Sequence, residues 1–385
     1  MATRASETAP PRPRLRPTTP GTTVLYSATA LLGLACAVGD ERPLLVAGAL
    51  YGLVVASVIA ARRAPRALEV RRSAPDAVYA GEPFAVAYDV TSGEARLPLD
   101  GLSIADGLES GGRKASAGGE PVPLPRLGPG ASARVEGELT AFRRGRARFG
   151  ALRLAAEPAP GLARLEASVA TGGEVLVLPR RGVIDARAAA PLLSRASEAD
   201  LAPASRSLGE DEWRGLREYR DGDPLRRVHW KLLARWPDRP MVREMEDARV
   251  REATILLETY TPGRDARRLS RLERALSFAT ALAEALLESG HRVRFRAFGP
   301  GPIAVDLAPG RGGAGDLAHA LALLEPSSER TVEDLLAAEE GRGAVFLLTI
   351  GEASDPAGDG APRGLPPGAL PIGPARMREL MYYAR

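Results

Sequence analysis

The chain is poor in cysteine, lysine, histidine and aromatic residues. Cys36 is the single cysteine among 385 residues, which excludes an internal disulfide framework and any metal site built from several cysteines. Only Lys114 and Lys231 are lysines, so arginine supplies nearly all of the 52 basic residues. Aromatic residues make up 5% of the chain, and aliphatic side chains must therefore fill most of any core.

Recognisable catalytic motifs are also missing. The sequence has no G-x-x-x-x-G-K-[ST] phosphate loop, no H-E-x-x-H motif and no G-x-S-x-G nucleophile elbow. The three histidines, His229, His291 and His319, are scattered along the chain. We therefore expect a protein that is not an enzyme and uses no cofactor. Acidic and basic residues are interspersed, with a net charge of +4, so no nucleic-acid partner is expected.

Two apolar runs lie near the N-terminus. Residues 1–20, rich in Pro, Thr, Ala and Arg, predict a disordered tail. Residues 22–38 and 44–61 are each about long enough to cross the hydrocarbon core of a bilayer. The charged turn at 39–43 is too short to be anything but a hairpin tip. We therefore predict two transmembrane helices within residues 21–62.

A cleaved signal peptide and a buried hairpin of a soluble protein are the alternatives. No small-residue cleavage site follows the first run, and a second apolar run does. Arginines flank the pair on both outer sides, whereas the tip carries one arginine and two acids. The flanking residues are Arg4, Arg12, Arg14, Arg16, Arg62, Arg63, Arg66, Arg71 and Arg72. The positive-inside rule then predicts a multi-pass protein of the inner (plasma) membrane, with both termini cytoplasmic.

The next region, residues 63–180, alternates between short apolar and polar positions. Residues 83–90, 131–139 and 146–154 show this alternation, with Gly and Pro between them. Short strands with regular turns predict a β-sandwich-like domain. It contains no histidine or cysteine, so we expect a spacer or interaction domain.

Residues 181–250 contain a dense charged segment and all three tryptophans. Asp223 followed by Pro224 predicts the start of a helix, with the aspartate as its N-cap. In that helix an apolar stripe would be formed by Leu225, Val228 and Leu232, and a basic stripe by Arg227, Lys231 and Arg235. Like charges spaced four residues apart repel, so the basic stripe needs anionic partners. These are either acids of the same segment or an external partner.

This segment resembles the signature of the domain of unknown function 58 family, approximately R-x-Y-x-x-G-D-x-x-R-x-I-x-W-x-x-x-A-R. The matching residues are Arg217, Tyr219, Gly222, Asp223, Arg226, Val228, Trp230, Ala234 and Arg235. Residues 143–146 and 157–162 are similar to two further elements of the family, K/R-R-G-x and D-P-F-G-L. In the second element a glutamate replaces the aspartate and the phenylalanine is lost. Lys231, inside the signature, is included in the candidate partner surface.

The resemblance implies a von Willebrand factor A-like α/β domain, here at residues 251–355, followed by a C-terminal tail at 356–385. Alternating strand and helix patterns after the signature fit a parallel sheet. Such domains often bind a divalent metal through a D-x-S-x-S motif after the first strand. This chain has Glu258 and Thr259 there, followed by the bulky Tyr260, so we expect no metal and regard this place as a degenerate candidate.

Three functions remain open from the sequence. The resemblance implies a membrane-anchored adaptor that faces the cytoplasm and works with a MoxR-type AAA+ ATPase. One alternative is an uncharacterised hydrolase that uses Asp221, Asp223, His229 and Lys231. The other is binding of anionic lipid or nucleic acid through the basic stripe, against which the interleaved acids count.

Overall fold

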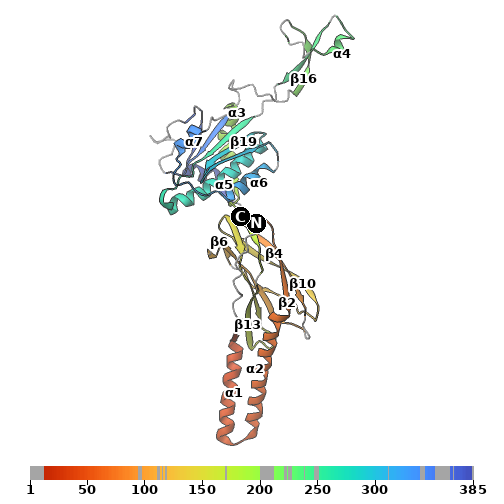
Figure 1. The fold of residues 1–385 in the computed structure, drawn as a ribbon, viewed down its shortest axis with the longest axis vertical. Coiled ribbons are helices and arrows are strands. Elements are labelled where there is room, and N and C mark those ends of the chain that lie inside the picture. The colour runs from red at the N-terminus through yellow and green to blue at the C-terminus, as the bar shows by residue number, and fades with distance from the viewer. Residues whose placement is uncertain are drawn as a thin grey trace, which may run out of the picture. The chain divides into compact units, whose positions relative to one another are not determined.

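The computed structural model describes most of the chain between residues 13 and 383 (Figure 1). The residues outside the description are 1–12, 94–97, 111–112, 115, 118, 170, 200–211, 221–222, 224–227, 238, 247–250, 311, 339–342, 352–364, 367 and 384–385. The chain divides into two compact units. One comprises Met1–Arg180 with Leu321–Leu323, and the other comprises Arg181–Ala320 with Leu324–Arg385.

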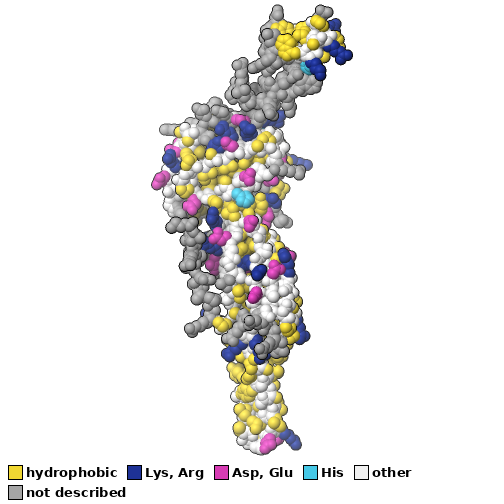
Figure 2. All heavy atoms as spheres, turned by 45° about the vertical axis from the view of Figure 1, so that its right-hand side comes forward, with side chains coloured by type: hydrophobic (Ala, Val, Ile, Leu, Met, Phe, Trp, Pro, Cys, Tyr) yellow, Lys and Arg dark blue, Asp and Glu magenta, His cyan; other side chains and the backbone are white. Residues whose placement is uncertain are grey.

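Helices α1 (Thr19–Val38) and α2 (Glu41–Ala67) form the N-terminal hairpin. The side chain of Thr18 accepts a hydrogen bond from the Gly21 amide and caps α1, and Gly39 ends this helix in the left-handed conformation. The two apolar spans have mean hydropathies of 1.6 and 2.4, and only 17% of each is buried. Hydrophobic side chains therefore cover the hairpin surface (Figure 2). Two apolar helices of membrane-spanning length are thus present, as predicted.

Small side chains fill the contact between α1 and α2. Ala28 and Ala35 on α1, and Ala47 and Ala61 on α2, are nearly fully buried, whereas the large side chains of both helices are mostly exposed. The hydroxyl oxygens of Thr29 and Tyr51 lie 2.9 Å apart and form an interhelical hydrogen bond. Small residues let two helix backbones approach closely, which is the usual packing mode of helices in lipid. A water-soluble helix pair would instead bury its large apolar side chains.

The chain before α1 forms a strand, although a disordered tail was expected there. Strand β1 (Arg14–Pro17) pairs antiparallel with β13 (Ala163–Val169). The Thr18 hydroxyl donates a hydrogen bond of 2.5 Å to the Gly161 carbonyl. Proline at the end of an edge strand removes no ladder hydrogen bond, which explains how a Pro-rich sequence can pair here. The hairpin is therefore joined to the β-rich domain through β1 as well as through α2.

The β-rich domain consists of three small sheets around one core. Its other strands are β2 (Leu68–Ser73), β3 (Ala77–Tyr79), β4 (Pro83–Ser92), β5 (Leu102–Ala105), β6 (Leu108–Ser110), β7 (Arg113–Lys114), β8 (Ser116–Ala117), β9 (Val122–Pro123), β10 (Ser132–Ala141), β11 (Gly145–Phe149), β12 (Leu152–Ala156) and β14 (Glu174–Leu178). The sheets run β1-β13-β12-β5-β9, β2-β4-β10-β8 and β3-β14-β11-β6-β7. Their inward positions, such as Val86, Ile104 and Leu154, alternate with exposed ones, which confirms the sheet-rich body predicted from the period of two.

A buried ionic network crosses this core. The Arg72 guanidinium is 2.8 Å from the Asp106 carboxylate, which also accepts a hydrogen bond of 3.0 Å from the Tyr88 hydroxyl. Arg72 further lies 4.4 Å from the centre of the Phe149 ring. Burial, and next the Asp106 charge, raise the pKa of the Tyr88 hydroxyl above its ordinary value. Arg72, one of the arginines that flank the apolar runs, is therefore a core residue of the β-rich domain.

The second unit contains a five-stranded sheet of order β20-β19-β18-β21-β22. Its main elements are β18 (Glu252–Leu257), the short 3₁₀ helix η2 (Pro262–Arg264), α5 (Ala266–Glu288), β19 (Arg292–Phe298), β20 (Pro302–Leu307), α6 (Gly313–Ala322), α7 (Val332–Ala338), β21 (Ala344–Leu348) and β22 (Leu370–Ile372). All neighbours pair in parallel except β20, which is antiparallel to β19. Leu256 packs with Leu335 and Leu336 of α7, while α5 packs against β18 and β19. The alternating strands and helices follow the predicted α/β pattern.

Segments on both sides of the predicted α/β boundaries also belong to this unit. Strand β15 (Gly182–Ile184) pairs with the C-terminal strand β23 (Met381–Tyr383), and helix α3 (Ala186–Ala199) packs against β21. Helix α8 (Pro374–Leu380) buries Met377 and Leu380. Residues 370–383, expected as a tail, are thus structured: their short apolar stretches become stable only when they pair with distant strands.

Candidate interaction surface

The family signature lies on a β-hairpin rather than on one long helix. Strands β16 (Glu212–Glu218) and β17 (Met241–Glu246) pair antiparallel, with an irregular register between Trp213 and Gly215. The Tyr219 amide donates to the Pro240 carbonyl at 2.8 Å and extends this ladder toward the tip. We call residues 212–246 the signature hairpin. More than twenty residues separate the two paired strands, so no local periodicity indicates their pairing. Neither strand was therefore predicted from the sequence.

Arg217 and Asp223 form the main ion pair of the signature hairpin. The two terminal nitrogens of Arg217 donate to the two carboxylate oxygens of Asp223 at 2.7 and 2.6 Å. The Arg220 amide adds a third hydrogen bond of 2.9 Å. The Arg217 hydrogen bond, followed by that from Arg220, lowers the pKa of Asp223 from 3.8 to about 2. Asp223 was expected to cap a helix that starts at residue 224, which lies outside the described residues; its described partners are Arg217 and the Arg220 amide after β16.

The helix described in this segment is one turn long, and residues 224–227, where the predicted helix begins, lie outside the described residues. Helix α4 (Trp230–Leu233) follows His229, whose ring nitrogen Nδ1 accepts a hydrogen bond of 3.2 Å from the Leu232 amide. Val228 forms a bridge to Val242, so a helix running through residue 228 is excluded. The predicted apolar and basic stripes therefore do not lie along a single helix.

In and directly after α4, the side chains of Trp230, Lys231, Arg235 and Trp236 are exposed. The exposed fractions of Trp230 and Trp236 are 59% and 55%, and the Arg235 guanidinium lies 5.9 Å from the centre of the Trp236 ring. We call these four residues the exposed patch. Trp230 matches the family signature, and its exposure argues against a buried anchoring role. Trp236, absent from the predicted site, carries as much exposed aromatic surface as Trp230.

The structure unites part of the predicted site. Arg217 and Asp223 are in direct contact, and Tyr219 is their neighbour in the turn. Lys231 and Arg235 lie on the exposed patch. Gly222 and Arg226, together with Arg227 of the basic stripe, lie outside the described residues. Crowding of tryptophans in one charged segment was the only sequence signal for Trp236.

Glu258 and Thr259, the degenerate metal candidate, both form hydrogen bonds within the α/β unit. The Glu258 carboxylate accepts from the amides of Ile350 and Gly351 at 2.8 and 3.3 Å. The Thr259 hydroxyl donates to the Phe298 carbonyl, and its side chain is buried. The described residues contain no group of three or more His, Cys, Asp or Glu arranged to hold a metal ion. The Glu258 side chain, which is longer than the aspartate of the motif, thus connects the end of β18 to the residues that follow β21.

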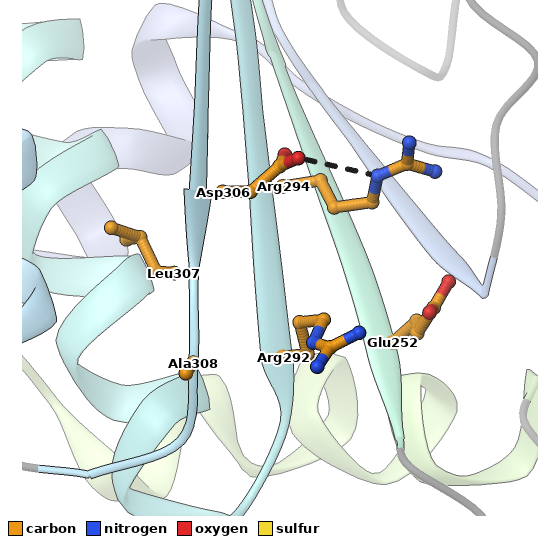
Figure 3. Close-up of a pocket in the computed structure, with 6 residues that line it drawn as sticks. All are labelled: Glu252, Arg292, Arg294, Asp306, Leu307 and Ala308. Atoms are coloured by element: carbon orange, nitrogen blue, oxygen red, sulfur yellow. Dashed lines mark ion pairs between the residues drawn. The ribbon is translucent and has the colours of Figure 1, made fainter. Parts of the chain in front are cut away.

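A shallow cavity of about 350 Å³ lies on one face of the same sheet (Figure 3). Arg292, Arg294 and Arg296 share this face of β19 because they are two residues apart. Asp306 of β20 lies 2.7 Å from Arg296 and 3.9 Å from Arg294. The hydrogen bond from Arg296 lowers the pKa of Asp306 below its ordinary value. These internal ion pairs neutralise much of the positive charge, and we assign the cavity no function.

Comparison with known proteins gives one family and several weak structural likenesses. Residues 215–350 match the family described as "Protein of unknown function DUF58". No curated protein matches the chain. Among solved structures, the CARDB domain of a Pyrococcus furiosus protein is 13% identical, with a TM-score of 0.19, over 29% of this chain and 94% of that one. The C-terminal domain of wzt is 11% identical, with a TM-score of 0.21, over 29% and 73%. These likenesses are too weak to carry an argument.

Proposed function

Starting from the fact that the chain belongs to the DUF58 family of proteins of unknown function, we propose that it is a membrane-anchored adaptor. In this proposal the helical hairpin inserts into the bacterial plasma membrane, both termini face the cytoplasm, and the exposed patch binds a protein partner. The partner that the family resemblance implies is a MoxR-type AAA+ ATPase. The observation that carries the proposal is the pair of exposed tryptophans beside Lys231 and Arg235.

The hairpin supports membrane insertion in two ways. Its large apolar side chains point away from the contact between α1 and α2. Exposure of these side chains to water is unfavourable, whereas exposure to lipid is not. Its charged residues lie at the ends: Asp40, Glu41 and Arg42 at the tip, and arginines at the base. An excess of arginine at the base favours a cytoplasmic location of that end.

The α/β unit supports the proposal of a von Willebrand factor A-like domain. Its sheet is parallel apart from the edge strand β20, and helices α5 and α7 pack against it. The hydrogen bonds of Glu258 and Thr259 favour a version of this domain that works without a metal at that place. A domain of this kind would act by contact with a partner rather than by chemistry of its own.

The exposed patch has the composition of a protein-binding surface. Tryptophan and arginine are the residues that most often dominate interface energetics, and exposed tryptophans have apolar area to bury. The Arg217–Asp223 ion pair fixes the turn that precedes them. Asp223 and His229, which the hydrolase hypothesis uses, are engaged in this turn and in the cap of α4. The described residues thus favour a binding role over a catalytic one.

Binding of the full chain to a purified MoxR-type ATPase tests the proposal. The chain is solubilised in mild detergent and immobilised, and binding of the ATPase is measured with and without nucleotide. We expect Lys231→Glu and the double change Trp230→Ala with Trp236→Ala to weaken binding at least tenfold. Arg267→Glu, at an exposed position of α5, makes the same change of charge and should leave binding unchanged.

Melting curves of the same variants separate binding from folding. If Lys231→Glu lowers the melting temperature, the basic residues stabilise the hairpin instead of a partner contact. If the unaltered chain does not bind the ATPase, the proposed partner is wrong. Loss of anionic vesicle or nucleic-acid binding in the Lys231→Glu chain would support the basic-stripe alternative.

A further inference from the structure

Four exposed arginines lie near the base of the helical hairpin. Helices α1 and α2 run in opposite directions from the tip of the hairpin, and each rises about 1.5 Å per residue. Residue 60 of α2, as far from the tip as Thr19 of α1, therefore lies about level with Thr19. Arg62 and Arg63 of α2 therefore lie at the height of the residues that precede α1, where β1 carries Arg14 and Arg16. Helix α2 packs beside β13, the strand that pairs with β1. We call Arg14, Arg16, Arg62 and Arg63 the arginine collar.

Among the residues that the structure describes, none forms an ion pair with an arginine of the collar. In the β1–β13 ladder, Arg16 stands directly opposite Arg164 and Arg14 opposite Glu166. Glu166 and Glu157 already lie 3.3 and 3.7 Å from Arg164. Like charges directly opposite each other in a sheet are unfavourable. All four collar residues are exposed.

The connection between hairpin and β-rich domain holds the collar in place. The Thr18 amide donates to the Leu162 carbonyl at 3.3 Å, and the Thr18 hydroxyl donates to Gly161. A side chain at Gly21 would come within 1.9 Å of the Leu162 carbonyl oxygen, so α1 begins in direct contact with this loop. Figure 1 shows β13 immediately next to the ends of both helices. Arg14 and Arg16 therefore cannot move away from the end of the apolar hairpin without breaking β1, and Arg62 and Arg63 are part of α2 itself.

We propose that the arginine collar binds the phosphate groups of anionic phospholipids at the cytoplasmic face of the membrane. This rests on the proposed insertion of the hairpin, because insertion places the collar at the headgroup level. Arginine forms bidentate hydrogen bonds with phosphate oxygens, and basic residues next to a membrane span are attracted to anionic lipids. The bound phosphates also relieve the repulsion between Arg16 and Arg164.

Lipid-dependent melting of the full chain tests the collar. The purified chain is reconstituted into vesicles of phosphatidylcholine alone, or of equimolar phosphatidylcholine and phosphatidylglycerol, and melted at low and high salt. We expect a higher melting temperature with phosphatidylglycerol, and a smaller difference at high salt. Competition between the two lipids for the detergent-solubilised chain, read by native mass spectrometry, should show a preference that falls roughly fivefold for each arginine removed.

The decisive variant changes all four collar residues to glutamine. The matched control is Arg143→Gln with Arg146→Gln, two exposed arginines near the start of β11, away from the hairpin base. The collar variant should lose the phosphatidylglycerol preference, the control should keep it, and a collar of four lysines should keep most of it. The proposal is overturned if the glutamine variant retains the preference, or if the control loses as much.

A separate measurement distinguishes this failure from failure of the membrane anchor. Flotation with pure phosphatidylcholine vesicles reports insertion independently of headgroup charge. If the unaltered chain floats but shows no lipid preference, the collar proposal is wrong and the anchor stands. If the unaltered chain does not float at all, the proposed insertion is wrong and the collar proposal fails with it.

Discussion

Asp223 is the residue whose protonation should control the turn of the signature hairpin. Its pKa of about 2 lies below the ordinary value of 3.8, so its ion pair with Arg217 stabilises the fold fully above pH 3.8 and is lost as the pH falls toward 2. Tryptophan fluorescence should therefore change over this interval in the unaltered chain. In the Asp223→Asn chain the same interval should show no such step; identical titrations would refute the role of the pair.

Trp230 should contribute little to stability because 59% of it is exposed. We expect Trp230→Ala to change the free energy of unfolding by less than about 1 kcal/mol, instead of the several kcal/mol typical of a buried aromatic residue. Val242, 1% exposed and bridged to Val228, is the comparison: Val242→Ala should cost about 1–2 kcal/mol. Denaturant unfolding of both variants measures this. A larger loss for Trp230→Ala would mean that the ring packs inside the molecule.

The signature could be recognised from sequence, but its local structure could not. The spacing of Arg217, Tyr219 and Asp223 identified the family, because motif matching needs only residue identity. The Asp-Pro pair at 223–224 is a good helix start in isolation. In the structure, Arg217 competes for the Asp223 carboxylate from six residues away, and Val242 pairs with Val228 from fourteen residues away. Contacts across a hairpin leave no trace in a local pattern.

At the scale of elements, the Arg72–Asp106–Tyr88 network should be the most sensitive polar feature of the β-rich domain. It connects β2 and β4 to the turn between β5 and β6. Asp106→Ala leaves the buried Arg72 charge uncompensated, for which we expect a loss of about 3–5 kcal/mol. Asp89→Ala removes a carboxylate that is half exposed and 3.9 Å from Arg134, and should cost less than about 0.5 kcal/mol. Melting of the detergent-solubilised chain compares them; equal losses would show that the network is not stabilising.

Long elements with a clear period were predictable, and short ones were not. The apolar runs at 22–38 and 44–61 became α1 and α2, and the alternating strand and helix patterns after the signature became elements such as β18, α5 and β19. Strands β1, β22 and β23 have three or four residues each and escaped notice. A strand of that length is stable only through its partner, so its own sequence carries little signal.

At the scale of the whole molecule, the hairpin should be the sole described element that inserts into the membrane. Truncating the chain from its N-terminus through the hairpin would also remove β1 and leave the edge of β13 unpaired, which favours aggregation. Because neighbouring helices lie about 8–10 Å apart, a short Gly-Ser linker can join Pro20 to Arg63 and replace residues 21–62. We expect this chain to be monomeric and soluble without detergent. If it still floats with vesicles of pure phosphatidylcholine, a surface other than the hairpin and the collar also binds lipid.

Topology can be determined with cysteine labelling, since Cys36 is the single native cysteine and can be changed to serine. In that background, an Asp40→Cys chain reports the tip of the hairpin, and a Phe142→Cys chain reports the β-rich domain at a position that is 61% exposed. Both outer ends of the hairpin carry arginines and its tip carries Asp40 and Glu41, so the positive-inside rule places the tip outside the cell. A membrane-impermeant maleimide should therefore label the Asp40→Cys chain in cells with a permeable outer envelope and an intact plasma membrane. The Phe142→Cys chain should react only after the plasma membrane is opened; the reverse pattern would invert the topology and place the signature hairpin outside.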